Sequence, residues 1–154
     1  MSSAPPRYQK PASCFGCPLH AQGHGYVPGS GPYSDLLFLG EAPGYDEAIM
    51  GLPFVGAAGG MHTRLTTRNG ISREAHRHEN VLRCVPKDFE IKPGWAEAAA
   101  THCRQYRAES FAKAKVIVAM GQTAIREALG LWNFSTDDVK VNNFHGTEIG
   151  RAHV

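Results

Sequence analysis

Residues 35–59 read DLLFLGEAPGYDEAIMGLPFVGAAG, and this stretch decides the fold. A short apolar run at 35–40 passes directly into a segment rich in glycine and proline. A continuous apolar run of this length is typical of a parallel strand that is buried on both faces. Ligands of open α/β sheets bind just beyond the carboxyl ends of such strands. We therefore expect residues 40–59 to form a binding loop at the edge of a sheet.

The glycines of this loop allow backbone N–H groups to approach a ligand closely, and Pro43 stiffens the turn. A helix that begins near Gly56 would add free N–H groups and the positive end of its dipole. The pattern predicts a rigid cradle for a polar, partly anionic ligand. A structural turn without a ligand is the alternative, since neither GxxxxGK[ST] nor GxGxxG is present.

The rest of the chain alternates between strand and helix patterns. Strands are predicted at 35–40, 80–85 and 115–121, and helices at 57–68, 93–111 and 122–130. Such alternation predicts an α/β fold, a three-layer α/β/α sandwich with a central, mainly parallel sheet.

The bulk composition fits one soluble domain. The chain has 154 residues, of which 42% are hydrophobic, and a formal net charge of +2. It contains no apolar run long enough for a membrane span and no signal-peptide pattern at its start, so we expect a cytoplasmic protein with no membrane partner. The small positive charge is compatible with nucleic acid without requiring it.

Four cysteines suggest a metal site. Cys14 and Cys17 form a CxxC pair, whose short turn can direct both sulfurs at one centre, while Cys84 and Cys103 stand apart. In a reducing compartment such thiols are either ligands or core residues. Their spacing leaves a metal or iron–sulfur site and scattered core thiols as open alternatives.

Several motifs then occur together and in order. They are CFGCPL at 14–19, GEAPG at 40–44, PFVGAAG at 53–59, NVLRC at 80–84, and a further cysteine at 103. This combination resembles the family-four, iron–sulfur uracil-DNA glycosylases over residues 14–147. The resemblance implies a DNA-repair hydrolase that cleaves the N-glycosidic bond of uracil in single- or double-stranded DNA, and we expect it to act as a monomer.

The resemblance also implies how the base is held. Phe54 would stack on the flipped uracil, an interaction worth about 1–3 kcal/mol per base. Asn80 would pair with uracil O4 and N3–H, a pattern that cytosine reverses. Without the resemblance, an ordinary core role for Phe54 and a strand-capping role for Asn80 would be the simpler interpretations.

Bond cleavage leaves negative charge on uracil O2, which backbone N–H groups around Glu41 and Ala42 would face. Glu41 is also the candidate for orienting a water molecule, and Gly40 is expected to bind the substrate. Ala42 stands where better-known uracil glycosylases carry an aspartate, so that general base is missing. Gly44 replaces their thymine-excluding tyrosine, and Tyr45 or Glu47 are our candidates for excluding the 5-methyl group.

The resemblance assigns a [4Fe–4S] cluster to the cysteines, with zinc as the chemical alternative. The ligands would be Cys14, Cys17, Cys84 and Cys103. Candidate phosphate contacts are Arg64, Arg68, Arg83 and Lys87, and the expected surface histidines are His62, His76 and His78.

The chain departs from the family in three places. Residues 85–87 read VPK where Arg-Pro-Pro is usual, residues 145–146 read HG where Arg-Gly is usual, and the His-Pro-Ser motif would lie beyond the chain. We therefore expect a domain at 1–147 that is incomplete at its C-terminus. Residues 148–154 are predicted to be a non-native tail, because one reverse translation contains a sequencing-adapter sequence. The alternatives are a catalytically impaired uracil-DNA binding module and a zinc-stapled α/β protein of other function.

Overall fold

The structure, a computed structural model, describes residues 4–90 and 94–132. Within these ranges the centre is a parallel sheet of three strands in the order β2-β1-β3. The strands are β1 (Leu36–Gly40), β2 (Arg77–Asn80) and β3 (Val116–Ala119). The predicted domain boundary at residue 147 and the predicted tail at 148–154 lie outside the described residues.

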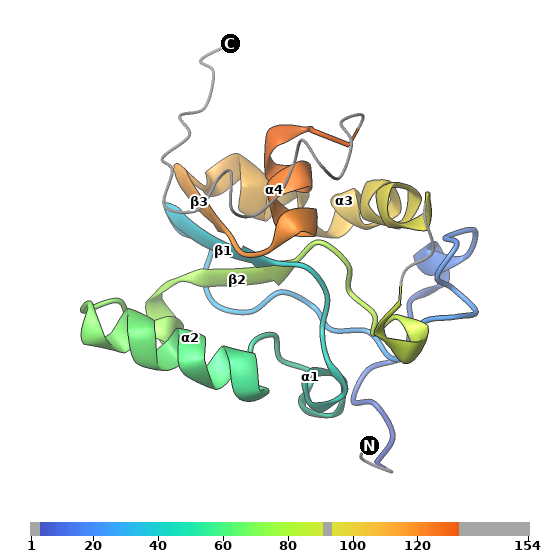
Figure 1. Cartoon of the computed structure of the whole chain (residues 1–154), viewed down its shortest axis with the longest axis horizontal. Helices are drawn as coiled ribbons and strands as arrows, with labels where there is room; N and C mark the ends of the chain where they lie inside the picture. Colours follow the sequence, from blue (N-terminus) through green and yellow to red (C-terminus); the bar gives the residue numbers. More distant parts are fainter. Residues whose placement is uncertain (1–3, 91–93, 133–154) are drawn as a thin grey trace.

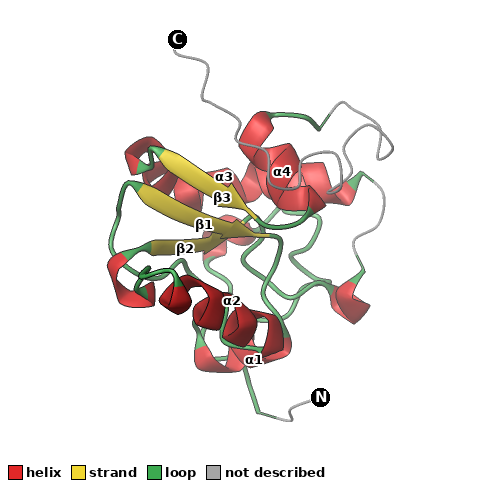
Figure 2. Cartoon of the chain, turned by 60° about the vertical axis from the view of Figure 1, so that its left-hand side comes forward, coloured by secondary structure: helices red, strands yellow, loops and turns green. Residues whose placement is uncertain are grey.

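Helices cover both faces of the sheet. On one face lie α1 (Tyr45–Met50) and α2 (Ala57–Arg68), and on the other lie α3 (Trp95–Lys113) and α4 (Gln122–Leu129) (Figures 1 and 2). Short 3₁₀ turns occur at Ala12–Cys14 (η1), Arg73–Ala75 (η2) and Lys87–Phe89 (η3). The predicted three-layer α/β/α arrangement with a parallel sheet is confirmed.

The central strand β1 divides the core between the two faces. Leu39 is fully buried and belongs to one apolar cluster with Ala99 and Ala100 of α3 and Ala124 of α4. Phe38 points to the opposite face, where its ring lies 4.6 Å from that of His62 on α2. This alternation is the period-two pattern of a strand buried on both sides.

The register of β1 and β2 determines which residues meet at the edge of the sheet. Gly40 pairs with Asn80, so the carboxyl ends of the two strands lie side by side. The loops that follow are held together as well, because Val81 and Leu82 donate their N–H groups to the carbonyls of Gly40 and Glu41 at 2.9 Å.

The strand predicted at 80–85 is wrong in position, because β2 ends where that strand should begin. The sequence of β2, RHEN, is polar, and its burial depends on tertiary partners. Glu79 is fully buried and accepts hydrogen bonds from Arg77, Arg83 and Ser110. The apolar residues after Asn80 are buried without being part of a strand.

The helix α1 is a second departure, since the residues between the strand at 35–40 and the helix at 57–68 were expected to form a loop. The helices predicted at 57–68, 93–111 and 122–130 are present within two residues of those limits, as are the strands predicted at 35–40 and 115–121. Among the described helices, none has the length and apolar character needed to cross a membrane.

Candidate active site

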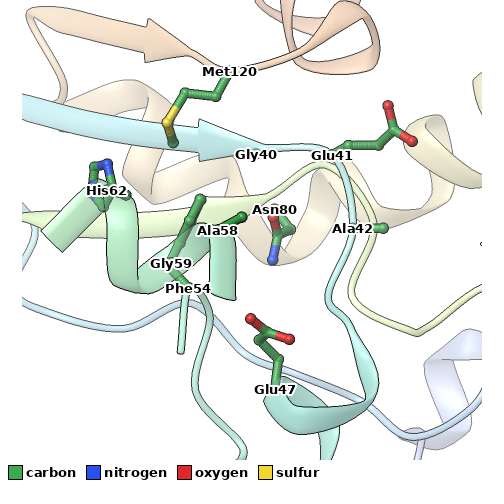
Figure 3. A pocket seen from close by; sticks show the side chains of 10 residues that line it. All are labelled: Gly40, Glu41, Ala42, Glu47, Phe54, Ala58, Gly59, His62, Asn80 and Met120. Carbon is green, nitrogen blue, oxygen red and sulfur yellow. The ribbon is translucent and has the colours of Figure 1, made fainter. Parts of the chain in front are cut away.

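A pocket of about 240 Å³ opens at the carboxyl ends of β1 and β2 (Figure 3). The pocket is lined by all six residues predicted to bind the substrate or take part in catalysis, namely Gly40, Glu41, Ala42, Glu47, Phe54 and Asn80. Four further residues complete the lining: Ala58, Gly59, His62 and Met120. The structure therefore brings the predicted side chains together, and their chemical roles stay predictions.

Asn80 supplies the polar group at the centre of the pocket. The residue is only 6% exposed, and none of the side-chain hydrogen bonds found among the described residues involves its amide. Its amide atoms are also not among the fully buried polar atoms that lack a partner, so they are reachable from the cavity and available to a ligand. Gly40 makes room for it, because a Cβ there would lie 2.5 Å from Asn80 Oδ1 and 2.8 Å from the tip of the Phe54 ring.

Phe54 lines the pocket, and its backbone has an unusual conformation. Its φ angle is 57°, in the left-handed region that residues other than glycine rarely adopt. Such a conformation costs on the order of 1–3 kcal/mol and persists only where surrounding contacts enforce it. Its ring lies 5.4 Å from that of His62 and 5.6 Å from that of His78, so one side of the phenyl group is backed by imidazoles.

The Glu47 carboxylate links separate parts of the loop through hydrogen bonds to three backbone N–H groups. Its Oε1 accepts hydrogen bonds from the N–H groups of Val55 at 3.1 Å and Gly56 at 2.8 Å, and its Oε2 accepts one from Gly44 at 3.0 Å. The carboxylate therefore joins the start of α1 to the start of α2. The expected free N–H groups near Gly56 are thus occupied, and the anion at this helix start belongs to the protein itself.

The remaining predicted residues differ in how they face the pocket. Glu41 is exposed, and its carboxylate points away from Phe54, Asn80 and Glu47 (Figure 3). Tyr45 packs against His24, with 5.4 Å between ring centroids, and against an apolar cluster around Ala48. Of the two residues predicted to exclude thymine, only Glu47 lines the pocket.

The prediction of three surface histidines is wrong for His78, which is 1% exposed, while His62 and His76 are half-buried. His78 Nδ1 lies 3.1 Å from the carbonyl of His76 and must donate to it. His78 Nε2 is then the acceptor for His62 Nε2 at 3.1 Å. Burial and the nearby Arg73 cation lower the pKa of His78 to about 4, and they also lower the pKa of His62, so both rings are neutral at pH 7.

One of the predicted phosphate contacts is also wrong. Arg83 is buried, and its guanidinium donates to Glu79 at 2.8 Å, to the carbonyl of Tyr106 at 2.6 Å and to the hydroxyl of Tyr26 at 3.0 Å. It serves the buried network around β2 and does not face DNA. Arg64, Arg68 and Lys87 are exposed and stay predictions.

The four cysteines line a second, small pocket between the N-terminal segment, the loop after β2 and α3. All four are free thiols. Gly23 makes room for one of them, because a Cβ there would lie 2.6 Å from Cys84 Sγ. Within the described ranges, no group of three or more His, Cys, Asp or Glu side chains is spaced to hold a single metal ion.

Polar groups surround this cysteine pocket. The Lys10 ammonium donates to the carbonyls of Leu19, His20 and Gly23 at 3.0, 2.5 and 2.5 Å, which fixes the loop that follows Cys17. Burial raises the pKa of Cys17 and Cys103, and raises that of Cys84 to about 12. Without a bound cation these thiols are therefore protonated, and metal binding would release their protons.

Sequence reasoning missed His62 and Met120 as lining residues. His62 follows Gly59 by three residues and Ala58 by four, so helical spacing places all three on one face of α2. That spacing was the available signal. Met120 follows β3 directly and reaches the pocket only because β3 pairs with β1, which no local pattern reveals.

Comparisons with known proteins agree with this geometry. The sequence model of the Uracil DNA glycosylase superfamily matches residues 28–153. The chain is 37% identical to the Type-4 uracil-DNA glycosylase of Archaeoglobus fulgidus over 124 residues, which are 79% of this chain and 61% of the relative. For the enzyme of the same name from Thermotoga maritima the identity is 37%, over 73% of this chain and 58% of the relative.

The Type-4 uracil-DNA glycosylase of Pyrobaculum aerophilum is 33% identical over 144 residues, 90% of this chain and 72% of the relative. The chain thus spans about three fifths of the length of the first two relatives. Sequence, fold and pocket agree, and the chain belongs to the uracil DNA glycosylase superfamily.

Proposed function

We propose that this chain carries the base-binding and bond-cleaving site of a DNA-repair uracil-DNA glycosylase, a hydrolase whose partner is uracil-containing DNA. One observation carries the proposal. The Asn80 amide, unpaired among the described residues, and the Phe54 ring line the same pocket at the ends of two parallel strands.

Base selection would follow from the chemistry of the amide. Asn80 can donate from its NH₂ group to uracil O4 and accept at Oδ1 from uracil N3–H. Cytosine presents a donor and an acceptor in the reverse order and would leave buried polar groups unpaired, which can cost about 10⁴-fold or more in rate. Phe54 would stack on the flipped base and hold its plane.

Cleavage would rely on charge stabilisation by the backbone. Negative charge develops on uracil O2, and backbone N–H groups around Glu41 and Ala42, two residues that line the pocket, would donate to it. One such donor is worth about 3–4 kcal/mol in the transition state. The flanking DNA phosphates would stabilise the positive charge on the sugar, and Glu47 would hold the loop in shape from its three N–H partners.

For the cysteine pocket we propose a structural [4Fe–4S] cluster held by Cys14, Cys17, Cys84 and Cys103. The donor set fits, because four thiols line one pocket and four thiolates are the usual ligands of such a cluster. Zinc is the chemical alternative, because tetrahedral ligation by four thiolates suits both. When bound, the cluster would cross-link the N-terminal segment, the loop after β2 and α3.

The second candidate is a uracil-DNA binding module that does not turn over. It is favoured by the carboxylates of the pocket, since Glu41 points away from it and Glu47 is occupied by three N–H groups. Neither is placed to activate a water molecule. We further expect a cytoplasmic monomer under either candidate.

The deciding experiment measures uracil release from an oligonucleotide with a single uracil, beside a gel shift on the same DNA. It uses the anaerobically purified chain, Asn80→Ala, and Asn69→Ala as a matched control. Asn69 is an exposed residue at the end of α2, and its amide donates to the Leu65 carbonyl at 2.8 Å.

We expect release by the unmodified chain and by Asn69→Ala, with a loss of about 10²-fold or more in Asn80→Ala. Uracil-selective binding without release would establish the binding module instead. If the unmodified chain neither releases uracil nor binds uracil-DNA selectively, both candidates are refuted.

A further inference from the structure

The left-handed backbone at Phe54 needs a partner that holds it. Its φ angle of 57° turns the phenyl ring into the pocket, and the same peptide follows Pro53 at a tight bend. Glycine would adopt this conformation without strain, but a phenylalanine stays there only under constraint. The question is which contacts supply that constraint.

Arg73, in the 3₁₀ turn η2, forms hydrogen bonds to the backbone of this bend. Its Nη1 donates to the Phe54 carbonyl at 2.9 Å, and its Nη2 donates to the carbonyl of Pro53. Two donors of one rigid guanidinium thus bind two consecutive carbonyls, a geometry that fixes direction as well as distance. Arg73 is half-buried and forms no salt bridge within the described residues. The two carbonyls are therefore the hydrogen-bond partners of its guanidinium group.

The helix α2 also packs closely against the Phe54 peptide. A Cβ on Gly59 would lie 2.1 Å from the carbonyl carbon and oxygen of Phe54. The Phe54 carbonyl is therefore held between the Gly59 backbone and the Arg73 guanidinium. Arg73 also lies close enough to the His62–His78 pair to favour their neutral forms, and these rings back the phenyl group.

We propose that Arg73 is a positioning residue that locks the Phe54 peptide in its left-handed conformation and so sets the plane on which the flipped base stacks. This inference rests on the proposed function of Phe54 as the stacking side chain. Arg73 is not one of the residues that line the pocket, so its effect on the base would pass through Phe54.

A double-mutant cycle tests this dependence. Single-turnover uracil release is measured for Arg73→Ala and Arg73→Lys, each alone and combined with Phe54→Leu. Arg104→Ala is the matched control, because Arg104 is an exposed arginine on α3, on the other face of the sheet, and pairs with Glu127.

We expect Arg73→Ala to slow release by about 10–100-fold, the effect of a small displacement of a binding group. Arg73→Lys, whose ammonium can donate to one of the two carbonyls, should release uracil at an intermediate rate. If Arg73→Ala does not fold, the cycle is measured with Arg73→Lys in its place. In the Phe54→Leu background the Arg73 effect should shrink below about threefold. Equal slowing in both backgrounds would overturn the proposal and mark Arg73 as a phosphate contact, with a matching change in salt dependence.

A second readout separates this inference from the proposed function. The protein is labelled with 4-fluorophenylalanine at its seven phenylalanines, and the Phe54 ¹⁹F resonance is identified by its loss in Phe54→Leu. Arg73→Ala should shift or broaden that resonance, whether or not the chain releases uracil. Absence of release by the unmodified chain would refute the glycosylase alone, whereas an unchanged Phe54 resonance would refute the role of Arg73.

Discussion

At the scale of single residues, two neighbouring glycines in the first turns of α2 have opposite requirements. A Cβ on Gly59 would meet the Phe54 carbonyl at 2.1 Å, whereas a Cβ on Gly60 would meet only the tip of Arg64, at 4.0 Å. Close approach of the two backbones therefore needs glycine at 59 and not at 60. The sequence GG presents the two positions as equivalent.

We predict that Gly59→Ala lowers the free energy of unfolding by about 1–3 kcal/mol and abolishes selective binding of uracil-DNA, because the Phe54 peptide must move. Urea unfolding and the gel shift measure the two effects. Gly60→Ala is the matched control, and replacing an open helical glycine should stabilise the fold by about 0.5–1 kcal/mol. Equal effects of the two substitutions would contradict the steric argument.

The buried imidazole of His78 predicts a loss of stability in acid. Its pKa falls from 6.5 to about 4 on folding, so the unfolded chain takes up a proton first. Stability is then complete above pH 6.5 and declines as the pH falls from 6.5 toward 4, by up to roughly 3 kcal/mol. Arg73 and His62 face the same ring and also lower its pKa, whereas the hydrogen bond to the His76 carbonyl raises it.

Urea unfolding of the wild type and of His78→Leu between pH 4 and 8 measures this effect. The difference in unfolding free energy between the two proteins should change through that interval and level off above pH 7. A difference that is independent of pH would show that the pKa of His78 is the same in the folded and the unfolded protein, which would contradict this prediction.

At the scale of elements, the short helix α1 and the longer α2 depend on one carboxylate. Glu47 lies on α1, accepts from Gly44 at its start, and accepts from Val55 and Gly56 before α2. Both helices lack a side-chain N-cap of their own, since each follows a glycine. The carboxylate therefore replaces the usual Ser, Thr, Asp or Asn cap for two helix starts.

We predict that Glu47→Gln costs about 1 kcal/mol of unfolding free energy and Glu47→Ala about 2–4 kcal/mol. Glutamine retains one accepting oxygen but places an NH₂ group against a backbone donor, whereas alanine leaves three N–H groups without an acceptor. Asp46→Ala is the control, because Asp46 is the exposed acid on the same turn. Equal losses at positions 46 and 47 would contradict this account.

The elements also show how far local patterns reach. The apolar run at 35–40 was predicted correctly because its own side chains are buried. The helical stretches at 57–68 and 122–130 were predicted correctly because local signals end them, Asn69-Gly70 and Gly130 respectively. The strand β2 was misplaced because its charged residues are buried by partners from α3 and the loop after β2. The helix α1 was missed because it is only six residues long and lies between Gly44 and Gly51 in a stretch rich in glycine and proline.

At the scale of the whole molecule, the cysteine pocket joins three segments that are distant in sequence. Cys14 and Cys17 lie near the N-terminus, Cys84 follows β2, and Cys103 lies on α3. A cluster bound there would act as a cross-link between these segments, so its loss should resemble the loss of a covalent bridge.

We predict that Cys84→Ser removes most of the iron and inorganic sulfide from anaerobically purified protein and lowers the unfolding free energy by about 2–4 kcal/mol. Metal analysis with an ultraviolet–visible spectrum, followed by urea unfolding, measures both. One equivalent of zinc in the unmodified protein in place of iron would establish the zinc alternative. Unchanged stability on metal loss would refute the cross-link.

Apolar runs and glycine-rich turns in the sequence were enough to predict the parallel α/β class and the loop after β1, because their geometry is expressed locally. Six residues of the pocket lining were predicted from the resemblance to a known family and not from local patterns. The tertiary structure was needed to show that Glu47 caps two helices, that Arg83 and His78 are buried, and that Arg73 donates to the carbonyls on either side of the Pro53–Phe54 bend. Each of these contacts joins residues from separate segments. Burial of a charge depends on the partner that arrives from elsewhere, and no local pattern contains that partner.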